Sequence, residues 1–307
     1  MPRRDQARAI EPPFIKDLRH ILLIFIDGIG IGEADAEKNP CAGKDLTYFS
    51  HFLDERYPKF LGEDGVVTGL DANLGIAGLP QSATGQTALL TGINGAQALG
   101  RHLNGYPNAK LREIIAEHSI LRKLKAMGLE VAFLNTFRPP FFDYDPFDII
   151  RHLSVTTVSN LYAGLPFFTL NDLLAERSIY QDMTNEALIE KGFAVPLYSP
   201  EKAGEIVAKQ SQNYFFCLYE YFQTDFAGHS RDMQRALAQV GKLDRFLHSV
   251  LAHARLDSTL IILTSDHGNM EDLSVKGHTR NPALTMLFGQ GSRAVHHYLK
   301  SILDVTP

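Results

Sequence analysis

Four short runs of nearly continuous apolar residues constrain the fold of this chain more than any other feature of its sequence. They are ILLIFID at 21–27, VAFLNT at 131–136, YFFCLYEY at 214–221 and STLIILTSD at 258–266. Such runs are typical of strands in a sheet that is covered on both faces. Between them, residues 111–128 and 233–254 place apolar side chains at helical spacing, and Gly128 is expected to end the first helix. The alternation predicts an α/β fold, a doubly wound and mainly parallel sheet with helices on both faces.

Aspartates follow three of these strands. One apolar run ends in Asp27, another ends in Asp266, and a third leads into Asp225. In a doubly wound sheet the carboxyl ends of the strands form the functional edge, so these side chains are expected to lie close together. Three buried carboxylates would repel one another strongly unless a cation were present. The strand ends therefore indicate a cation site.

Histidines accompany the aspartates, although each motif also has a purely structural interpretation. Asp225 and His229 in DFAGH would share one face of a helix, but they would also suit a capped helix start with a surface histidine. Asp266 and His267 can reach one site from a turn at the strand end, or they form only an Asx turn. His278 in KGHTRNP is either a ligand or a solvated loop residue.

Taken together, these residues favour a metal centre. The candidates are three carboxylates and three imidazoles: Asp27, Asp225, His229, Asp266, His267 and His278. Mixed oxygen and nitrogen ligands suit Zn²⁺ or Mn²⁺ better than Ca²⁺. This set is too large for one tetrahedral zinc ion and suits two ions. Two ions about 3.5–4 Å apart can clamp the attacking and leaving oxygens of a phosphoryl transfer.

The segment LPQSATGQTALLTG at 79–92 places hydroxyl side chains where a strand-to-helix turn is expected. These hydroxyls either cap the helix that follows or include a nucleophile. The N-terminus of such a helix would offer backbone donors and a positive potential to a phosphate group.

In this order, the motifs resemble those of the alkaline phosphatase superfamily, and most closely its branch with cofactor-independent phosphoglycerate mutase and phosphopentomutase. The likeness rests on DGIG, QSATGQTALLTG, DFAGH, SDHGNMED and GHTRNP, and runs from about residue 20 to 285. The resemblance implies two divalent metal ions, Zn²⁺ or Mn²⁺. One ion would be held by Asp225, His229 and His278, and the other by Asp27, Asp266 and His267.

The same resemblance assigns the nucleophile to Ser82, with Thr84 as the second choice because some members use threonine. Coordination by a divalent ion would lower the pKa of this hydroxyl and make it reactive near neutral pH. Two residues depart from the mutases. Gln81 stands in place of an asparagine, and Gln86 stands in place of a histidine.

The chain is also too short for the inserted domain of the mutases, so little or no cap domain is expected. Without a cap to retain the released product, hydrolysis is favoured over transfer back to it. We therefore expect a two-metal phosphohydrolase that acts on a small phosphate ester through a phosphoseryl intermediate. The alternatives are a phosphomutase of the phosphoglycerate or phosphosugar type, a phosphodiesterase, sulfatase or phosphonate hydrolase of the same superfamily, and a non-catalytic metal-binding protein.

Some basic residues are candidates for contact with the substrate anion, although each also suits an ordinary surface charge. They are Arg138, Arg151, Lys276 and Arg280. Residues 137–170 are rich in proline and aromatic side chains, and form either a small lid or insertion over the site or an ordinary packed loop. The expected organisation is an N-terminal extension at 1–19 and a single metalloenzyme domain at 20–307.

The composition limits the partners and the cellular location that are expected for this protein. The formal net charge of −5 argues against a non-specific nucleic-acid-binding protein, and the 2 cysteines cannot build a disulfide framework or a CxxC zinc site. The apolar run ILLIFI is too short for a membrane span, and the N-terminus lacks a signal-peptide pattern. We expect a cytoplasmic enzyme or binding protein with no nucleic-acid or membrane partner, and the alternative is a leaderless fragment of an exported protein. A homo-oligomer is possible but is not specifically indicated.

Overall fold

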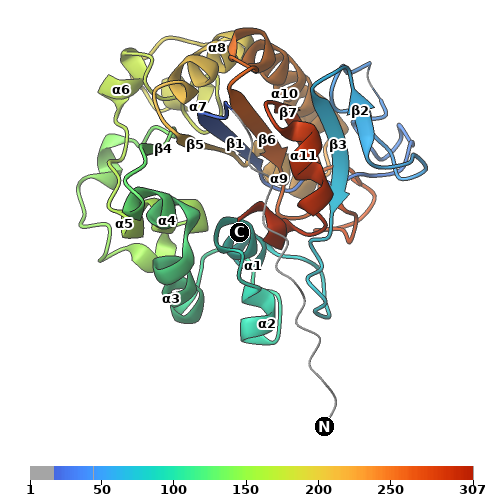
Figure 1. Ribbon diagram of the computed structural model, residues 1–307, viewed down its shortest axis with the longest axis horizontal. Helices are drawn as coiled ribbons and strands as arrows, with labels where there is room; N and C mark the ends of the chain where they lie inside the picture. The colour runs from blue at the N-terminus through green and yellow to red at the C-terminus, as the bar shows by residue number, and fades with distance from the viewer. Residues whose placement is uncertain (1–16, 44, 307) are drawn as a thin grey trace.

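The computed structural model describes residues 17–306 except residue 44. Most of the expected N-terminal extension, residues 1–16, therefore lies outside the described residues. In the described part, the chain forms one 7-stranded sheet with helices packed against it (Figure 1).

The sheet is built around β1 (His20–Ile26). This strand pairs in parallel with β5 (Phe216–Tyr221) on one side and with β6 (Thr259–Thr264) on the other. β4 (Val131–Phe133) continues the parallel part beside β5. These four strands coincide with the four apolar runs of the sequence, although β1 begins one residue earlier, at His20, and β4 is shorter than its run.

Three further strands extend the sheet beyond β6 through antiparallel pairs. β7 (Ala283–Gly289) pairs with β6, β3 (Gly65–Leu70) with β7, and β2 (Lys59–Leu61) with β3. The strand order is β2-β3-β7-β6-β1-β5-β4. β7 starts at the edge of the sheet where β6 ends, so it must run in the opposite direction. The predicted α/β class is confirmed, and the sheet is mixed, with a parallel part that carries the functional strand ends.

The α-helices are α1 (Ser82–Thr91), α2 (Gly95–Leu99), α3 (Ala109–His118), α4 (Ile120–Ala126), α5 (Val155–Ala163), α6 (Leu170–Leu174), α7 (Glu186–Glu190), α8 (Pro200–Ser211), α9 (Gln223–Ser230), α10 (Met233–His253) and α11 (Ser292–Val295). Short 3₁₀ turns are η1 (Pro139–Phe141), η2 (Ile150–His152), η3 (His296–Tyr298) and η4 (Ile302–Val305). Among the described residues, no helix combines the length and the apolar character that crossing a membrane would require.

The stretch 111–128, which was predicted as one helix, lies in two helices. α3 ends and α4 begins at Ser119, whose ψ of 132° is extended rather than helical. Ser119 donates its backbone N–H to Ile115 O, and its carbonyl accepts from Lys123 N. One residue thus closes the first helix and opens the second. By contrast, α10 covers the predicted stretch 233–254 almost completely.

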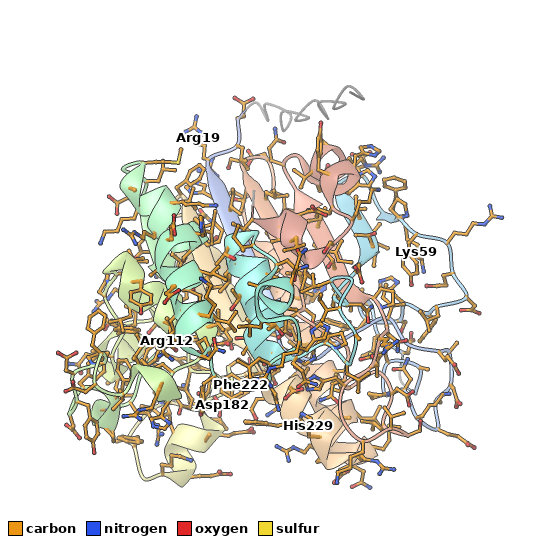
Figure 2. The ribbon with its side chains drawn as sticks, turned by 90° about the horizontal axis from the view of Figure 1, so that it is seen from below. Arg19, Lys59, Arg112, Asp182, Phe222 and His229 are labelled. Atoms are coloured by element: carbon orange, nitrogen blue, oxygen red, sulfur yellow. The ribbon has the colours of Figure 1, made fainter. Side chains whose placement is uncertain are left out.

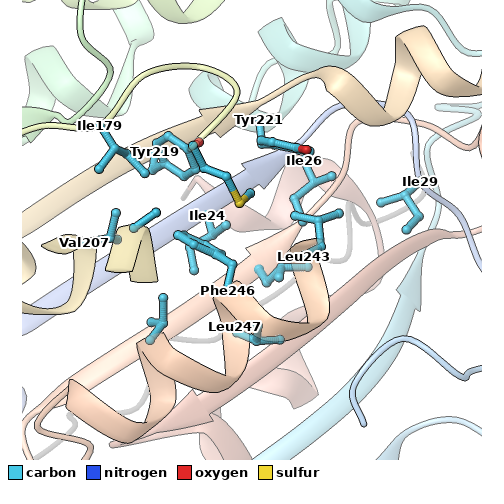
Figure 3. Close-up of a cluster of buried hydrophobic side chains, with 14 of the residues drawn as sticks. Ile24, Ile26, Ile29, Ile179, Val207, Tyr219, Tyr221, Leu243, Phe246 and Leu247 are labelled. Atoms are coloured by element: carbon cyan, nitrogen blue, oxygen red, sulfur yellow. The ribbon is translucent and has the colours of Figure 1, made fainter. Parts of the chain in front are cut away.

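Alternate residues of β1 face opposite sides of the sheet and pack against different helices. Leu22, Ile24 and Ile26 belong to the core with α8 and α10 (Figure 3). Leu23 and Phe25 belong to the core with α1, α3, α4 and α5, which form the other layer in Figure 1. Full burial of each such side chain contributes about 1.5–3 kcal/mol. This double burial explains why β1 is apolar at every position from Ile21 to Ile26.

The packing fixes the positions of the strand ends. Arg19, which precedes β1, lies at the opposite end of the molecule from His229 in Figure 2. The carboxyl ends of β1, β5 and β6 therefore open toward the His229 side, because these strands are parallel.

Candidate active site

Residues after β1 and β6 form the first candidate metal site, called the Asp27 group: Asp27, Asp266 and His267. His267 Nε2 lies 3.3 Å from Asp27 Oδ1 and 3.5 Å from Asp266 Oδ2. All three side chains are buried. These two carboxylate oxygens have no hydrogen-bond partner in the described part of the protein. Buried, unpaired oxygens that converge on an imidazole nitrogen suit a divalent cation.

The second candidate site, called the Asp225 group, consists of Asp225, His229 and His278. Asp225 and His229 are four residues apart on α9, so their side chains project from one face of the helix. Asp225 Oδ2 lies 3.3 Å from His229 Nε2, and Asp225 Oδ1 lies 3.4 Å from His278 Nε2. The Nε2 atoms of the two histidines are 3.3 Å apart. These atoms suit a second cation.

The two groups lie side by side. The rings of His267 and His278 stack with their centroids 3.7 Å apart and their planes 16° from parallel. Ser82, the first residue of α1, places its Oγ 3.0 Å from His267 Nε2. The fold thus brings the six candidate ligands and Ser82 to one edge of the sheet.

Burial and mutual proximity shift the pKa values of these groups. Burial, and then the charge of Asp266, raises the pKa of Asp27. Burial, and then Asp225, raises the pKa of Asp266 to about 7. Burial and the nearby His278 lower the pKa of His267 to about 3, so its imidazole is neutral at pH 7. A neutral imidazole is the form that binds a metal ion, and a cation would favour the ionised carboxylates.

Hydrogen bonds orient individual ligand atoms. Gln86 Nε2 donates to Asp27 Oδ2 over 3.1 Å, which leaves Asp27 Oδ1 facing His267. His278 Nδ1 lies 2.7 Å from Pro80 O. Because a carbonyl oxygen only accepts, Nδ1 carries the proton, and Nε2 is free to bind a metal ion.

Two glycines allow the backbone to approach the site. Gly28 has a φ of +72°, and a Cβ there would lie 2.8 Å from Asp225 Oδ1. A Cβ on Gly85, in α1, would lie 2.8 Å from Asp266 O, so this helix can pack so closely on the strand end only with glycine. Asn269 Nδ2 holds Asp225 from the other side, donating to its Oδ1 over 2.6 Å.

Glu271 connects the loops that carry the ligands, and the sequence analysis did not select it. Its Oε2 accepts from Gly30 N at 2.8 Å and from Asn269 N at 2.7 Å. Its Oε1 accepts from Asn281 Nδ2 at 3.1 Å and from the hydroxyl of Thr279. The buried carboxylate thus ties the loop after β1 to the loop after β6 and to the residue that follows His278.

The hydroxyls of α1 differ in their partners. Thr84 Oγ1 is fully buried, donates to a backbone carbonyl and accepts from Leu103 N. Thr87 and Thr91 each donate to the carbonyl oxygen four residues earlier, at 2.6 Å. Ser82 is the residue of this segment whose hydroxyl lies beside a candidate metal ligand.

Glu220 is a further buried carboxyl at the site. It lies near the end of β5, and Thr156 Oγ1 donates to its Oε2 over 2.7 Å. Burial raises the pKa of Glu220 to about 7, although this hydrogen bond opposes the rise. Glu220 also contributes to the raised pKa of Asp27. A carboxyl inside the apolar run 214–221 was the signal that could have identified it.

A cavity of about 810 Å³ lies against Ser82, Asp27, Asp225 and His229. The segment 137–170 forms much of its wall, with side chains that include Phe137, Arg138, Phe141, Tyr144, Ile149 and His152. Arg138 is the one basic candidate from the sequence that lines the cavity among the described residues. Arg151, Lys276 and Arg280 lie outside the lining.

Segments of curated relatives are similar to parts of this chain. A 2,3-bisphosphoglycerate-independent phosphoglycerate mutase of Wolinella succinogenes is 29% identical over 99 residues, covering 30% of this chain and 20% of the relative. One of Agrobacterium fabrum is 32% identical over 116 residues, covering 35% of this chain and 22% of the relative. The matched segments thus span about a fifth of the length of these relatives.

Solved structures share the fold over nearly the whole chain. An alkaline phosphatase from the Antarctic bacterium TAB5 has a TM-score of 0.54 at 15% identity, with 95% of this chain and 97% of that chain covered. A phosphoglycerate mutase of Leishmania mexicana has a TM-score of 0.55 at 11% identity, with 96% and 95% covered. The PH0037 protein of Pyrococcus horikoshii has a TM-score of 0.54 at 17% identity, with 90% and 87% covered.

These similarities confirm the alkaline phosphatase-like fold. The sequence model of the metalloenzyme superfamily matches residues 19–303. Membership implies divalent metal ions, in agreement with the two ligand groups. The resemblance inferred from the motifs is confirmed, and the chain belongs to the metalloenzyme superfamily.

Proposed function

We propose that this chain is a two-metal phosphohydrolase in which Ser82 attacks a phosphate ester and carries the phosphoryl group as phosphoserine. The observation that carries the proposal is the 3.0 Å distance between Ser82 Oγ and His267 Nε2, inside a pair of three-residue ligand groups. A hydroxyl held at this distance from a ligand atom is placed to share the same cation.

The ligand groups suit Zn²⁺ or Mn²⁺, because each combines carboxylate oxygens with imidazole nitrogens. One ion would be held by Asp27, Asp266 and His267, and the other by Asp225, His229 and His278. When bound, the two ions would supply the positive charge that lowers the pKa of the serine hydroxyl and offsets the charge of the phosphoryl group.

The chain itself orients the reacting groups. α1 begins at Ser82, so the positive end of its dipole and its first N–H groups lie where a phosphoryl group on Oγ would sit. Gln86 fixes the orientation of Asp27, and Pro80 fixes that of His278. Side chains held in this way lose little orientational freedom when the substrate binds.

The described chain has no inserted domain between α1 and β4. This absence favours hydrolysis over transfer of the phosphoryl group within the substrate. That stretch contains α2, α3 and α4, and α3 and α4 belong to the hydrophobic core on one face of the sheet. A domain that closes over the site would retain the product for return of the phosphoryl group. With the site open on one side, water can reach the phosphoserine.

The proposal is tested by phosphate release from a panel of phosphate esters, with Zn²⁺ and with Mn²⁺. Ser82→Ala should lower kcat by about 10³-fold or more, because it removes the attacking atom. Thr84→Val is the matched control from the same helix, and the folded variant should retain activity. Equal activity of Ser82→Ala and wild type would refute the role of Ser82.

A phosphomutase is the second candidate, because the curated relatives named above are phosphoglycerate mutases. Turnover in ¹⁸O-labelled water separates the two reactions. Hydrolysis places a solvent oxygen in the released phosphate, whereas a mutase moves the phosphoryl group without it. A product isomer free of solvent oxygen would show that the protein is a mutase and not a hydrolase.

A further inference from the structure

We propose that the substrate is a phosphate ester whose alcohol portion carries an aromatic ring and bears no carboxylate or second phosphate. This inference rests on the proposed phosphohydrolase function and identifies the class of its substrate. It follows from the size of the cavity beside Ser82, from the aromatic side chains around it and from the charges that line it.

The cavity is large for a small phosphate ester. Its volume of about 810 Å³ is in the upper part of the range that binds drug-sized ligands, roughly 300–1,000 Å³. It contacts Ser82 and both ligand groups directly, so it is the space that the alcohol portion of a substrate would occupy. A three-carbon alcohol would leave most of the cavity wall in contact with water.

Mutually packed aromatic rings form one wall. Phe137 contacts Phe133 at a centroid distance of 6.0 Å, Phe141 at 4.5 Å and Phe167 at 4.8 Å. Phe133, Phe137 and Phe141 line the cavity, and Phe167, outside the lining, packs against Phe137 and Phe141. Rings held by one another in this way form a rigid apolar surface, which favours an apolar ligand at little entropic cost.

Aromatic residues at the mouth of the cavity remain exposed. Tyr106 is 54% exposed, Tyr144 is 61% exposed and Phe226 is 50% exposed, although all three line the cavity. Phe226 also contacts Phe222 edge to face at 5.4 Å, and Figure 2 shows Phe222 on the same side of the molecule as His229. Exposed aromatic rings that converge on one cavity indicate a binding site rather than a scattered surface.

The position of Phe226 connects this surface to the chemistry. It lies on α9 between Asp225 and His229. A ring stacked on Phe226 would therefore belong to a group attached close to the phosphoryl group held by these residues. The aromatic surface and the proposed leaving oxygen are thus within reach of one small molecule.

The lining offers few cationic partners to a second anionic group. Arg138 is the one arginine among the described lining residues, and no lysine lines the cavity there. Glu220 adds a carboxyl beyond those of the two ligand groups. A carboxylate on the alcohol portion would find Arg138 as the one arginine partner in the described lining, with the buried carboxyl of Glu220 nearby. Phosphoglycerate, which carries such a carboxylate, therefore fits the cavity poorly.

The test compares esters whose alcohols have similar acidity, so that differences report binding rather than leaving-group chemistry. Ethyl phosphate, 2-cyclohexylethyl phosphate and 2-phenylethyl phosphate are assayed with the metal-loaded protein, together with 3-phosphoglycerate and a nucleoside 5′-monophosphate. The inference predicts kcat/KM for the phenylethyl ester about tenfold or more above that for the ethyl ester, equivalent to roughly 1.4 kcal/mol. It also predicts a clear preference over the cyclohexyl ester, and 3-phosphoglycerate as the poorest substrate. The nucleotide distinguishes a nucleoside from a simple aryl alcohol as the source of the ring.

Substitutions in the cavity lining test which residues produce the preference for the phenylethyl ester. Phe226→Ala and Tyr106→Ala should each lower the ratio of kcat/KM for the phenylethyl ester to kcat/KM for the ethyl ester several-fold. Phe60→Ala is the matched control, because Phe60 is 51% exposed on β2 and lies outside the lining. Equal values for the ethyl and phenylethyl esters, or an equal preference for the cyclohexyl ester, would overturn the inference.

Binding of phosphonates separates this inference from the proposed reaction. 2-Phenylethylphosphonate and ethylphosphonate are titrated calorimetrically into the metal-loaded protein. Tighter binding of the phenyl compound without release of phosphate from any ester would overturn hydrolysis and leave the ring preference standing. Phosphate release from all the esters without a ring preference in either assay would overturn the substrate class and leave hydrolysis standing.

Discussion

Gln86 Nε2 donates a hydrogen bond of 3.1 Å to Asp27 Oδ2, at a position where the sequence departs from the mutases that it resembles. The bond leaves Asp27 Oδ1 directed at His267. Gln86 is 3% exposed, so water cannot easily replace the amide. The glutamine is therefore part of the support of the Asp27 group.

Gln86→Ala should weaken metal binding at the Asp27 group by about 10–100-fold, because the orienting hydrogen bond is lost. Titration against a competing chelator measures this effect. Thr91→Val, at the far end of the same helix, removes a hydroxyl that donates to Thr87 O and accepts from Ile93 N, and should leave metal affinity unchanged. Equal weakening in both variants would show that the helix as a whole, rather than the bond to Asp27, is responsible.

His229→Ala should reduce the bound metal from two equivalents to one. His229 belongs only to the Asp225 group, and its side chain is 43% exposed, so its loss should spare the fold and the Asp27 group. Elemental analysis after dialysis gives the count. His248→Ala, on α10 away from both groups, should retain both ions. Two equivalents in His229→Ala would contradict the assignment of this residue.

In the metal-free protein, the contribution of Glu220 to stability should fall as the pH rises from about 4.5 to 7, whereas His267, whose pKa is lowered to about 3, acts in the opposite direction over this range. Burial raises the pKa of Glu220 to about 7, so the folded protein keeps a proton that the unfolded chain releases near 4.5. Because Glu220 binds more protons in the folded state, its contribution to the free energy of unfolding falls through this window and levels off above it. The contribution of Glu220 is roughly 3 kcal/mol.

Urea unfolding in the presence of a chelator measures this dependence, and Glu220→Gln isolates the contribution of Glu220. The free energy of unfolding of the wild type minus that of the variant should fall between pH 4.5 and 7, because groups present in both proteins, such as Asp266 and His267, cancel in this difference. The same slope in the variant and the wild type would contradict the burial-driven shift of Glu220.

Glu271→Gln should destabilise the protein by about 1–3 kcal/mol for each donor left without an acceptor. An amide in place of the carboxylate turns an N–H₂ group toward donors such as Gly30 N or Asn281 Nδ2. Chemical denaturation gives the free energy of unfolding. Asp272→Asn is the neighbouring control, because its carboxylate bonds within an exposed turn to Ser274. An unchanged free energy of unfolding in Glu271→Gln would show that the loops do not depend on this carboxylate.

The sequence predicted the site well where strand topology alone determines position. Asp27 and Asp266 follow parallel neighbours, so their convergence was expected from the apolar runs. The division of the ligands into two sets came from the resemblance, and the structure places the same two sets together.

The supporting bonds could not be predicted, because they depend on how separate elements rotate against one another. Gln86 reaches Asp27 because α1 packs tightly on the strand end at Gly85. The aromatic cavity could not be predicted for the same reason, since Tyr106, Phe137 and Phe226 come from segments far apart in the chain. Glu220 was different, because a charge inside an apolar strand was visible in the sequence.

The most direct test of the account is mass spectrometry of peptides from the metal-loaded protein, quenched with acid during turnover of a phosphate ester. We predict one phosphoryl group on the peptide that contains Ser82, located on Ser82 by fragmentation and missing in Ser82→Ala. Phosphate on Thr84 or on another residue, or steady turnover by Ser82→Ala with no phosphopeptide, would contradict the central claim.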